Sequence, residues 1–336
     1  MSKKALVAKL IFKYLRFFSY YLDQMKSNQL SILGYHRIFD HDRKNFPFYR
    51  SIISANPEMF EQQMRFIKKN FNVINFQIMQ QMIDAGEKIP KGTLIITFDD
   101  GYADNYDIVF PILKKYDLTA TIFTLTSSIN DGEPFWFEIV KYFFDTCKSG
   151  VYTFKDETLR LDITDGNREA ARKEFWIYIR AIENARRVSI IKKIKKDLST
   201  APSATDLELI KPLNWDRIRE MSDQGIEFGS HTISHPYLTN LTPDELIHEL
   251  TVSKKIIEEN INKPVISIAY PFGAHNVQVE EQVRKCGYRF GISYRNDVIK
   301  KWNQQDTFKL PRIHVDYEFD YFFFKARLLL PGLFLN

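Results

Sequence analysis

Cysteine is scarce in this sequence, with two residues, Cys147 and Cys286, in a chain of 336. The two lie far apart and form no Cys-x-x-Cys pair, which argues against a disulfide framework and against a cysteine-based metal site. No Gly-x-Gly-x-x-Gly or Walker-type loop follows a predicted strand, so nucleotide binding has no support. The net charge of +5 is small and does not indicate nucleic acid as a partner.

An uninterrupted apolar run is also missing from the N-terminus. Lys9, Lys13 and Arg16 interrupt residues 1–28, which match neither a secretory signal nor a bilayer-spanning helix. The three cations would form one stripe of a helix, as in a helix that lies in a membrane interface, although a helix packed on the domain fits as well. The apolar residues 319–336 are either a second membrane contact or a last core helix. Without a cleaved leader we expect a cytoplasmic protein, peripheral on the inner face of the membrane, and an extracytoplasmic location stays open.

The remaining composition, with 44% hydrophobic and 26% charged residues, is that of a soluble globular protein. Short apolar runs alternate with amphipathic segments from residue 29 onward, which predicts an α/β domain with a parallel sheet, either a barrel or a doubly wound sheet. Residues from about 130 to 212 break this rhythm, because they lack strand patterns and read as helices. We expect a helical insertion there. On a barrel loop it would lie near the functional site, and a flap without a chemical role is the alternative.

Polar side chains follow several predicted strands. Asp99 and Asp100 follow one apolar run, His231 and His235 follow another, and His36 ends a third. Because the carboxyl ends of parallel strands meet at one edge of a sheet, we expect these five side chains to lie together.

The residue types in this group are typical of a metal-dependent hydrolase. His231 and His235 are four residues apart, so a helical turn would point both imidazoles in one direction. Two histidines and one carboxylate form a common catalytic zinc set, which one of the two aspartates completes. The other aspartate would then lie beside a water molecule whose pKa the cation lowers, and it could accept that proton.

Three segments carry a resemblance to a known family: TFDDGY (97–102), HTISH (231–235) and AYPFG (269–273). In this order they resemble the first three motifs of the polysaccharide deacetylase family, carbohydrate esterase family 4, also called the NodB-homology domain. The resemblance implies a distorted (β/α) barrel, a divalent metal that is usually zinc, and hydrolysis of the N-acetyl group of an amino sugar. The barrel would span residues 29–336, interrupted by the insertion, with residues 1–28 as a separate helix.

The resemblance also implies roles for individual residues. Asp99 corresponds to the general base, and the metal ligands correspond to Asp100, His231 and His235. The backbone N–H of Phe272 corresponds to a donor to the tetrahedral oxyanion, beside the metal itself. Substrate contacts are implied for the remaining motif residues, which are Tyr102, Tyr270, Pro271 and Gly273.

Three departures from the family pattern concern the same site. The third motif begins with Ala269 instead of the arginine that holds the base aspartate, and Arg312 of KLPRIHV is a candidate replacement. The tryptophan-bearing fourth motif is not recognisable. The general-acid histidine has two candidates. GYHRI (34–38) is similar to a motif of the permuted poly-N-acetylglucosamine deacetylases and favours His36, whereas His314 on a late strand is the alternative.

We therefore expect an amino-sugar N-deacetylase that acts on a cell-envelope glycan or its lipid-linked precursor. Asp99 would be the general base, His36 the general acid, and a water activated by the metal the nucleophile. Two other functions fit the sequence: a barrel that binds glycan without turning it over, and a hydrolase of another amide C–N bond on the same fold. The carboxylates and imidazoles argue against the first, since binding alone needs no base beside a metal.

Overall fold

The computed structural model describes residues 4, 6, 7, 30–40, 42, 46–154, 159–197, 201–299 and 307–335. Nearly all of the helix expected over residues 1–28 lies outside these residues, so its contact with a membrane stays a prediction. Within the described part, no helix combines the length and the apolar character that a bilayer crossing requires.

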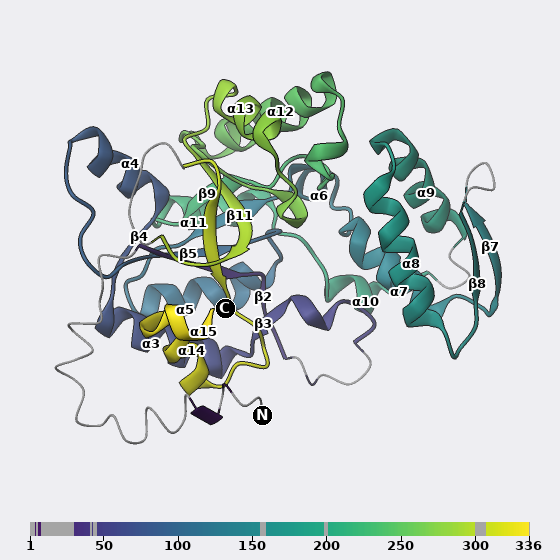
Figure 1. The fold of residues 1–336 in the computed structure, drawn as a ribbon, viewed down its shortest axis with the longest axis horizontal. Helices are drawn as coiled ribbons and strands as arrows, with labels where there is room; N and C mark the ends of the chain where they lie inside the picture. The colour runs from purple at the N-terminus through teal and green to yellow at the C-terminus, as the bar shows by residue number, and fades with distance from the viewer. Residues whose placement is uncertain are drawn as a thin grey trace.

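Seven parallel strands form a closed barrel (Figure 1), in the order β1, β12, β11, β10, β9, β6 and β5, and β1 pairs with β5 to close the ring. A short strand, β4, pairs with the first half of β5. The second half of β5 pairs with β6 along the same edge. The closed ring confirms the distorted (β/α) barrel that the family resemblance implied. The strands are β1 (Ser31–Tyr35), β4 (Asn72–Ile74), β5 (Thr93–Phe98), β6 (Thr121–Thr124), β9 (Glu227–Ser230), β10 (Ser267–Ala269), β11 (Phe290–Asn296) and β12 (Leu310–His314).

The barrel strands are buried, which explains why they appear in the sequence as short apolar runs rather than as alternating patterns. All six residues of β5 are buried, and the hydroxyl of Thr97 is satisfied because it donates to the carbonyl of Leu33 at 2.6 Å. The register places Tyr35 of β1 opposite Phe98 of β5. The residues that follow these strands therefore emerge at one rim of the barrel.

Helices cover the outside of the barrel (Figure 1). Asparagine side chains cap four of them, α3, α4, α11 and α13, and Thr242 forms a capping box with Glu245 at the start of α12. A π-helical turn, Asn105–Val109, precedes α5, so Pro111 lies in the first turn of that helix, where its missing N–H costs little. The helices are α3 (Pro57–Asn70), α4 (Phe76–Asp84), α5 (Phe110–Lys115), α11 (Trp215–Asp223), α12 (Pro243–Ile261), α13 (Val277–Lys285), α14 (Tyr321–Leu329) and α15 (Pro331–Phe334).

The segment between α6 (Thr126–Asp131) and α11 forms a lobe beside the barrel (Figure 1), here called the insertion. It has its own apolar core, which includes Phe143, Phe175 and Ile190. It also contains an antiparallel strand pair that the sequence reading missed. In β8 the buried Leu159, Leu161 and Ile163 alternate with two exposed residues. This alternation covers five residues, which is too short to identify a strand between two predicted helices. Its elements are α7 (Trp136–Thr146), β7 (Gly150–Phe154), β8 (Leu159–Ile163), α8 (Arg168–Ala181), α9 (Asn184–Asp197) and α10 (Ala204–Glu208).

The apolar C-terminal segment packs on the barrel rather than standing away from it. Phe323, Phe324 and Leu328 of α14 are buried, and the ring of Tyr321 meets Phe66 of α3 edge-on at 6.3 Å. Of the described residues in this segment, Leu333 is the large apolar side chain that stays exposed, at 66%. Packing therefore accounts for most of its hydrophobic character, as the core-helix alternative supposed.

The stability of the barrel should depend on pH through Glu227, at the first position of β9. Burial raises the pKa of Glu227 to about 7, although its Oε2 accepts from the N–H of Phe76 and the hydroxyl of Thr121, both at 2.7 Å. The folded protein therefore holds a proton that the unfolded chain has already released. Between the unfolded pKa and the folded pKa the free energy of unfolding should fall as pH rises, by up to ~3 kcal/mol.

Glu227→Gln should flatten this slope, because the amide does not titrate. Urea denaturation of both proteins at half-unit steps between pH 4.5 and 7.5 measures the effect. Glu259→Gln, at an exposed position of α12, is the control and should keep the wild-type slope. Parallel stability curves for wild type and Glu227→Gln would contradict the prediction.

Candidate active site

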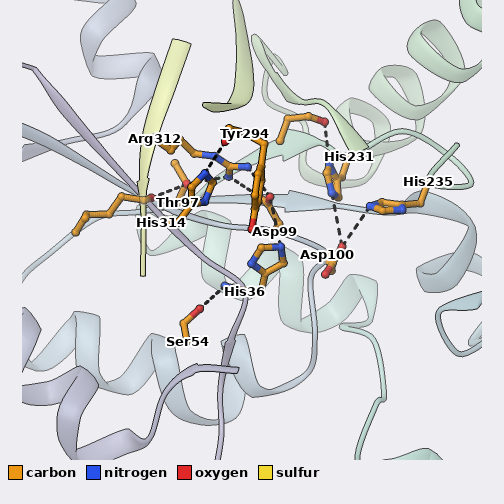
Figure 2. Close-up of polar contacts among 12 residues, drawn as sticks. His36, Ser54, Thr97, Asp99, Asp100, His231, His235, Tyr294, Arg312 and His314 are labelled. Carbon is orange, nitrogen blue, oxygen red and sulfur yellow. Dashed lines mark hydrogen bonds and ion pairs between the residues drawn. The ribbon is translucent and has the colours of Figure 1, made fainter. Parts of the chain in front are cut away.

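The described residues enclose a cavity of about 840 Å³ at the rim where the strands end. All five side chains expected to meet at one edge line this cavity (Figure 2): His36, Asp99, Asp100, His231 and His235. They follow β1, β5 and β9, and the N–H of Asp99 donates to the carbonyl of Tyr35 at 3.0 Å, which joins two of these strand ends. The closure of the barrel thus brings together residues that are up to 199 positions apart in the sequence, from His36 to His235.

Asp99 is held by Arg312 of β12 through two parallel hydrogen bonds (Figure 2). The guanidinium Nη1 donates to Oδ1 and Nη2 donates to Oδ2, each at 2.7 Å. Arg312 is 1% exposed, and a Cβ added at Gly34 would approach its Cδ to 3.3 Å, so glycine at this position leaves the arginine its space. The structure therefore places Arg312 where the sequence suggested a replacement for the missing motif arginine.

This pairing determines the charge of Asp99. Burial by itself would raise the pKa of the carboxyl, but the charge and hydrogen bonds of Arg312 outweigh it and hold the pKa of Asp99 well below its usual range. Asp99 is therefore a carboxylate at any pH near neutral, with a fixed orientation. Such a group can accept a proton from a water molecule in the cavity.

Asp100, His231 and His235 form a second cluster beside it. Oδ1 of Asp100 lies 3.6 Å from Nε2 of His231 and 3.8 Å from Nε2 of His235, and one ligand atom from each residue lies within 4.8 Å of the other two. Nδ1 of His231 bonds the carbonyl of Ala269 at 2.8 Å, the outer contact that commonly orients a ligating imidazole. Three buried donor atoms thus converge without bonding one another, a set that fits a divalent cation with nitrogen and oxygen ligands.

The protonation states agree with such a set. Burial lowers the pKa of His231, and burial and the neighbouring His231 lower that of His235, so both imidazoles are neutral and can act as ligands. Burial and the charge of Asp99 raise the pKa of Asp100. A cation bound here would replace the proton that this environment favours, so its affinity should depend on pH.

The two histidines do not lie on a helical turn, and that part of the sequence reading is wrong. Residues 231–235 form an irregular loop in which Thr232 and His235 have φ of +71° and +53°. The loop is held by Glu249 of α12, which accepts from the N–H groups of Ile233 and Ser234 at 2.7 and 3.1 Å. The tertiary contact with Glu249, rather than helical periodicity, therefore positions the imidazoles.

The two candidate general acids occupy different places. His36 lines the cavity, with its Nε2 3.9 Å from Oδ2 of Asp99, and burial lowers its pKa to about 4. His314 is not among the lining residues. Its ring packs on Tyr294, with centroids 3.8 Å apart, and its Nε2 bonds the carbonyl of the same residue at 2.9 Å (Figure 2). Geometry therefore favours His36 as the histidine that faces a substrate.

The remaining motif residues divide between the cavity and the protein interior. Phe272 lines the cavity, with φ of +56°, and its ring stacks on Tyr237 with centroids 4.2 Å apart. Tyr270 also lines it, while its hydroxyl donates to the carbonyl of Phe308. Tyr102 is fully buried, donates to Glu138 and does not reach the cavity.

Pro271 and Gly273 are likewise absent from the cavity lining. Gly273 has φ of +65°, and a Cβ there would lie 2.3 Å from that of Tyr294. Its contribution is therefore the close approach of two backbone segments. Pro271 is buried in the same short turn.

Sequence reasoning did not assign several cavity residues. Tyr294 of β11 and Trp176 of α8 line it, as do Phe137 of α7 and every residue of the segment 46–52 except Pro47. The signal available was the pair of tryptophans, Trp136 and Trp176, in an insertion expected near the site. Nothing in the sequence pattern marks Tyr294, whose ring extends toward Asp99 and His36 (Figure 2).

Removal of Arg312 should destabilise the fold, because Asp99 would be left as an unpaired buried charge. Arg312→Met is expected to lower the free energy of unfolding by about 3–5 kcal/mol. The double variant Arg312→Met, Asp99→Asn should recover much of this loss, because the remaining group is neutral. Urea unfolding in the presence of a chelator measures both. A double variant less stable than Arg312→Met would contradict the electrostatic explanation.

Comparison with known proteins identifies the family of the chain. Residues 86–291 match the family model for polysaccharide deacetylase. The chain is 23% identical over 273 residues to YxkH of Bacillus subtilis (80% of this chain, 69% of YxkH), and 25% identical over 257 residues to the poly-beta-1,6-N-acetyl-D-glucosamine N-deacetylase of Staphylococcus epidermidis (71% and 84%). The fold matches that of the Streptococcus pyogenes deacetylase PplD in complex with acetate, with a TM-score of 0.58, 21% identity and coverage of 86% of this chain and 93% of PplD. The chain therefore belongs to the polysaccharide deacetylase family.

Proposed function

We propose that this N-deacetylase removes acetyl groups from amino sugars of a cell-envelope glycan, with a divalent cation at Asp100, His231 and His235, Asp99 as general base and His36 as general acid. The proposal rests on one observation: a carboxylate held ionised by Arg312 lies beside a cluster of three cation-ligand side chains in the same cavity. A relative named as a poly-beta-1,6-N-acetyl-D-glucosamine N-deacetylase supports the choice of substrate class.

The chemistry follows from the positions of the side chains. A divalent cation, zinc for this ligand set, would polarise the acetyl carbonyl and make water more acidic. Asp99 accepts the proton of the water that adds to the carbonyl carbon. The C–N bond then breaks, and the nitrogen takes a proton from His36, so that the products are acetate and a free amine. Because Oδ2 of Asp99 lies 3.9 Å from Nε2 of His36, the proton taken from water has a short path to the imidazole.

Two further groups assist this step. Arg312 keeps Asp99 ionised and fixes the orientation of its carboxylate through a hydrogen bond to each oxygen. The carboxylate therefore does not have to reorient before it accepts a proton. The N–H of Phe272 is the proposed donor to the oxygen that becomes negative, and the positive φ of this residue turns the backbone of the 271–273 segment at the cavity wall. A non-glycine residue keeps such a conformation where surrounding contacts hold it, and Tyr237 and His235 pack against the Phe272 ring.

Acetate release from N-acetylglucosamine oligomers should require a divalent cation. We expect activity to disappear with a chelator and to return with zinc, and Asp100→Asn to lose at least a hundredfold in kcat/KM together with cation affinity measured by calorimetry. Asp223→Asn, which changes an exposed carboxylate, should behave as wild type. A lipid-linked N-acetylated sugar, assayed in parallel, tests the membrane-linked form of the substrate. Undiminished activity of Asp100→Asn would contradict the proposed ligand set, and oligomer binding without acetate release would favour a glycan-binding barrel.

The two histidines should differ in kinetics. His36→Gln is expected to lower kcat by about 10²–10⁴, since a positioned proton donor contributes that much, with little change in cation affinity. His314→Gln should retain most of the activity, because its ring lies behind Tyr294 and outside the cavity lining. Steady-state rates at matched folded fraction distinguish them. A larger loss for His314→Gln than for His36→Gln would reverse the assignment.

A further inference from the structure

The insertion builds the outer wall of the active-site cavity. Five residues of α8 line it, spaced so that they share one face of the helix: Glu169, Arg172, Lys173, Trp176 and Arg180. Phe137, Lys141 and Asp145 of α7 also line it, at intervals of four. The lobe is therefore part of the site rather than a remote flap. At about 840 Å³ the cavity is large enough for more than one sugar residue.

Trp176 lies at the centre of the α8 face in a fixed position. Its Nε1 donates to the hydroxyl of Tyr49 at 2.7 Å, and Trp136 and Phe272 pack against its ring with centroids 5.5 and 5.9 Å away. The side chain is half-buried. A rigid, partly exposed indole offers a flat apolar surface, and the C–H groups on the face of a sugar ring pack on such surfaces.

The charges around this tryptophan are predominantly positive. Outside the catalytic centre the cavity lining holds two acidic side chains, Asp145 and Glu169, and five cationic ones, which leaves an excess of three positive charges: Arg50, Lys141, Arg172, Lys173 and Arg180. A cleft lined by charges of one sign concentrates ligands of the opposite sign.

The excess lies on Arg50, whose guanidinium packs over the ring of Phe46, and on two cations of α8. Arg172 pairs with Glu169 and lies 3.5 Å from Asp145, and Lys141 pairs with Asp145, so these cations are largely neutralised. Lys173 has a single pairing, at 3.8 Å, with the already shared Glu169. Arg180 has no ion pair with an acidic group of the described residues, and its Nε donates to the hydroxyl of Tyr237. Lys173 and Arg180 are exposed, on either side of Trp176 along the helix.

We propose that this outer part of the cavity is a subsite for an anionic sugar residue next to the N-acetylated residue. Trp176 packs against its ring, and Lys173 and Arg180 attract its phosphate or carboxylate group. The inference rests on the proposed function and extends it to the substrate class.

The positive charge of the subsite has a second consequence. A neighbouring residue that has already lost its acetyl group carries an amine, and the subsite should repel this amine in its cationic form.

The test compares four oligosaccharides that differ only in the residue next to the acetylated one: a neutral sugar, a sugar phosphate, a uronic acid and a free amine. At pH 6.5 and low salt we expect kcat/KM to be three- to tenfold higher for the anionic substrates than for the neutral one, and lower again for the amine. The differences should shrink at high salt. The phosphate and uronic acid arms show which anion is preferred.

The double variant Lys173→Gln, Arg180→Gln should abolish the anion preference, so that kcat/KM for the anionic substrates falls to the value for the neutral one. Lys192→Gln, Lys196→Gln is the matched control, since it removes two exposed positive charges from α9 outside the cavity lining and should keep the preference. Trp176→Ala should raise KM for all four oligosaccharides. Equal kcat/KM for neutral and anionic substrates, or a preference unchanged in the Lys173, Arg180 variant, would overturn the inference.

Calorimetric binding of the same oligosaccharides separates this inference from the proposed function. If no oligosaccharide releases acetate, the proposed function fails, and tighter binding of the anionic forms that disappears in the Lys173, Arg180 variant would still establish the subsite. Equal dissociation constants for the neutral and anionic forms would exclude it.

Discussion

The buried ion pair between Asp99 and Arg312 is the contact on which the site depends. A carboxylate buried at the rim of a barrel is stable only with a partner, and a guanidinium that donates to both oxygens supplies charge and orientation together. The pair joins β5 to β12 across the barrel interior and uses the space that Gly34 leaves open. At Ala269, where the family pattern has an arginine, the carbonyl bonds Nδ1 of His231, and Arg312 of β12 is the side chain that bonds Asp99.

Around this pair the backbone adopts conformations that barrel strands and helices do not provide. Asp100, Thr232, His235 and Phe272, four of the six described non-glycine residues with positive φ, belong to the cavity rim. Each such conformation costs free energy and persists where the surrounding structure holds it. Glu249 and the Thr232 hydroxyl hold the histidine loop through hydrogen bonds to its N–H groups. Rigid elements behind the rim thus stabilise loops that a short peptide of the same sequence would not maintain.

The insertion is connected to the catalytic rim through Glu138 of α7. This buried carboxylate accepts from the hydroxyl of Tyr102, two residues from Asp100, and from the N–H of Tyr49, whose hydroxyl bonds Trp176. One side chain therefore joins the aspartate loop, the 46–52 segment and the tryptophan wall. The apolar core of the lobe extends to the rim as well, because it includes Tyr237 and the ring of Phe272 packs against it.

The family, the barrel and the five polar side chains that meet at its rim could be predicted from the sequence, because buried parallel strands leave continuous apolar runs and polar residues follow directly at their ends. Arg312 could be proposed from its late strand. Tertiary structure alone decided that it meets Asp99, that His36 rather than His314 faces the cavity, and that the two histidines sit on an irregular loop. It alone brought Trp176, Tyr294 and Glu249 to the site. The reason is physical: spacing along a chain encodes local periodicity, whereas the approach of residues separated by a hundred positions depends on how the barrel closes and which side chains fill the space within it.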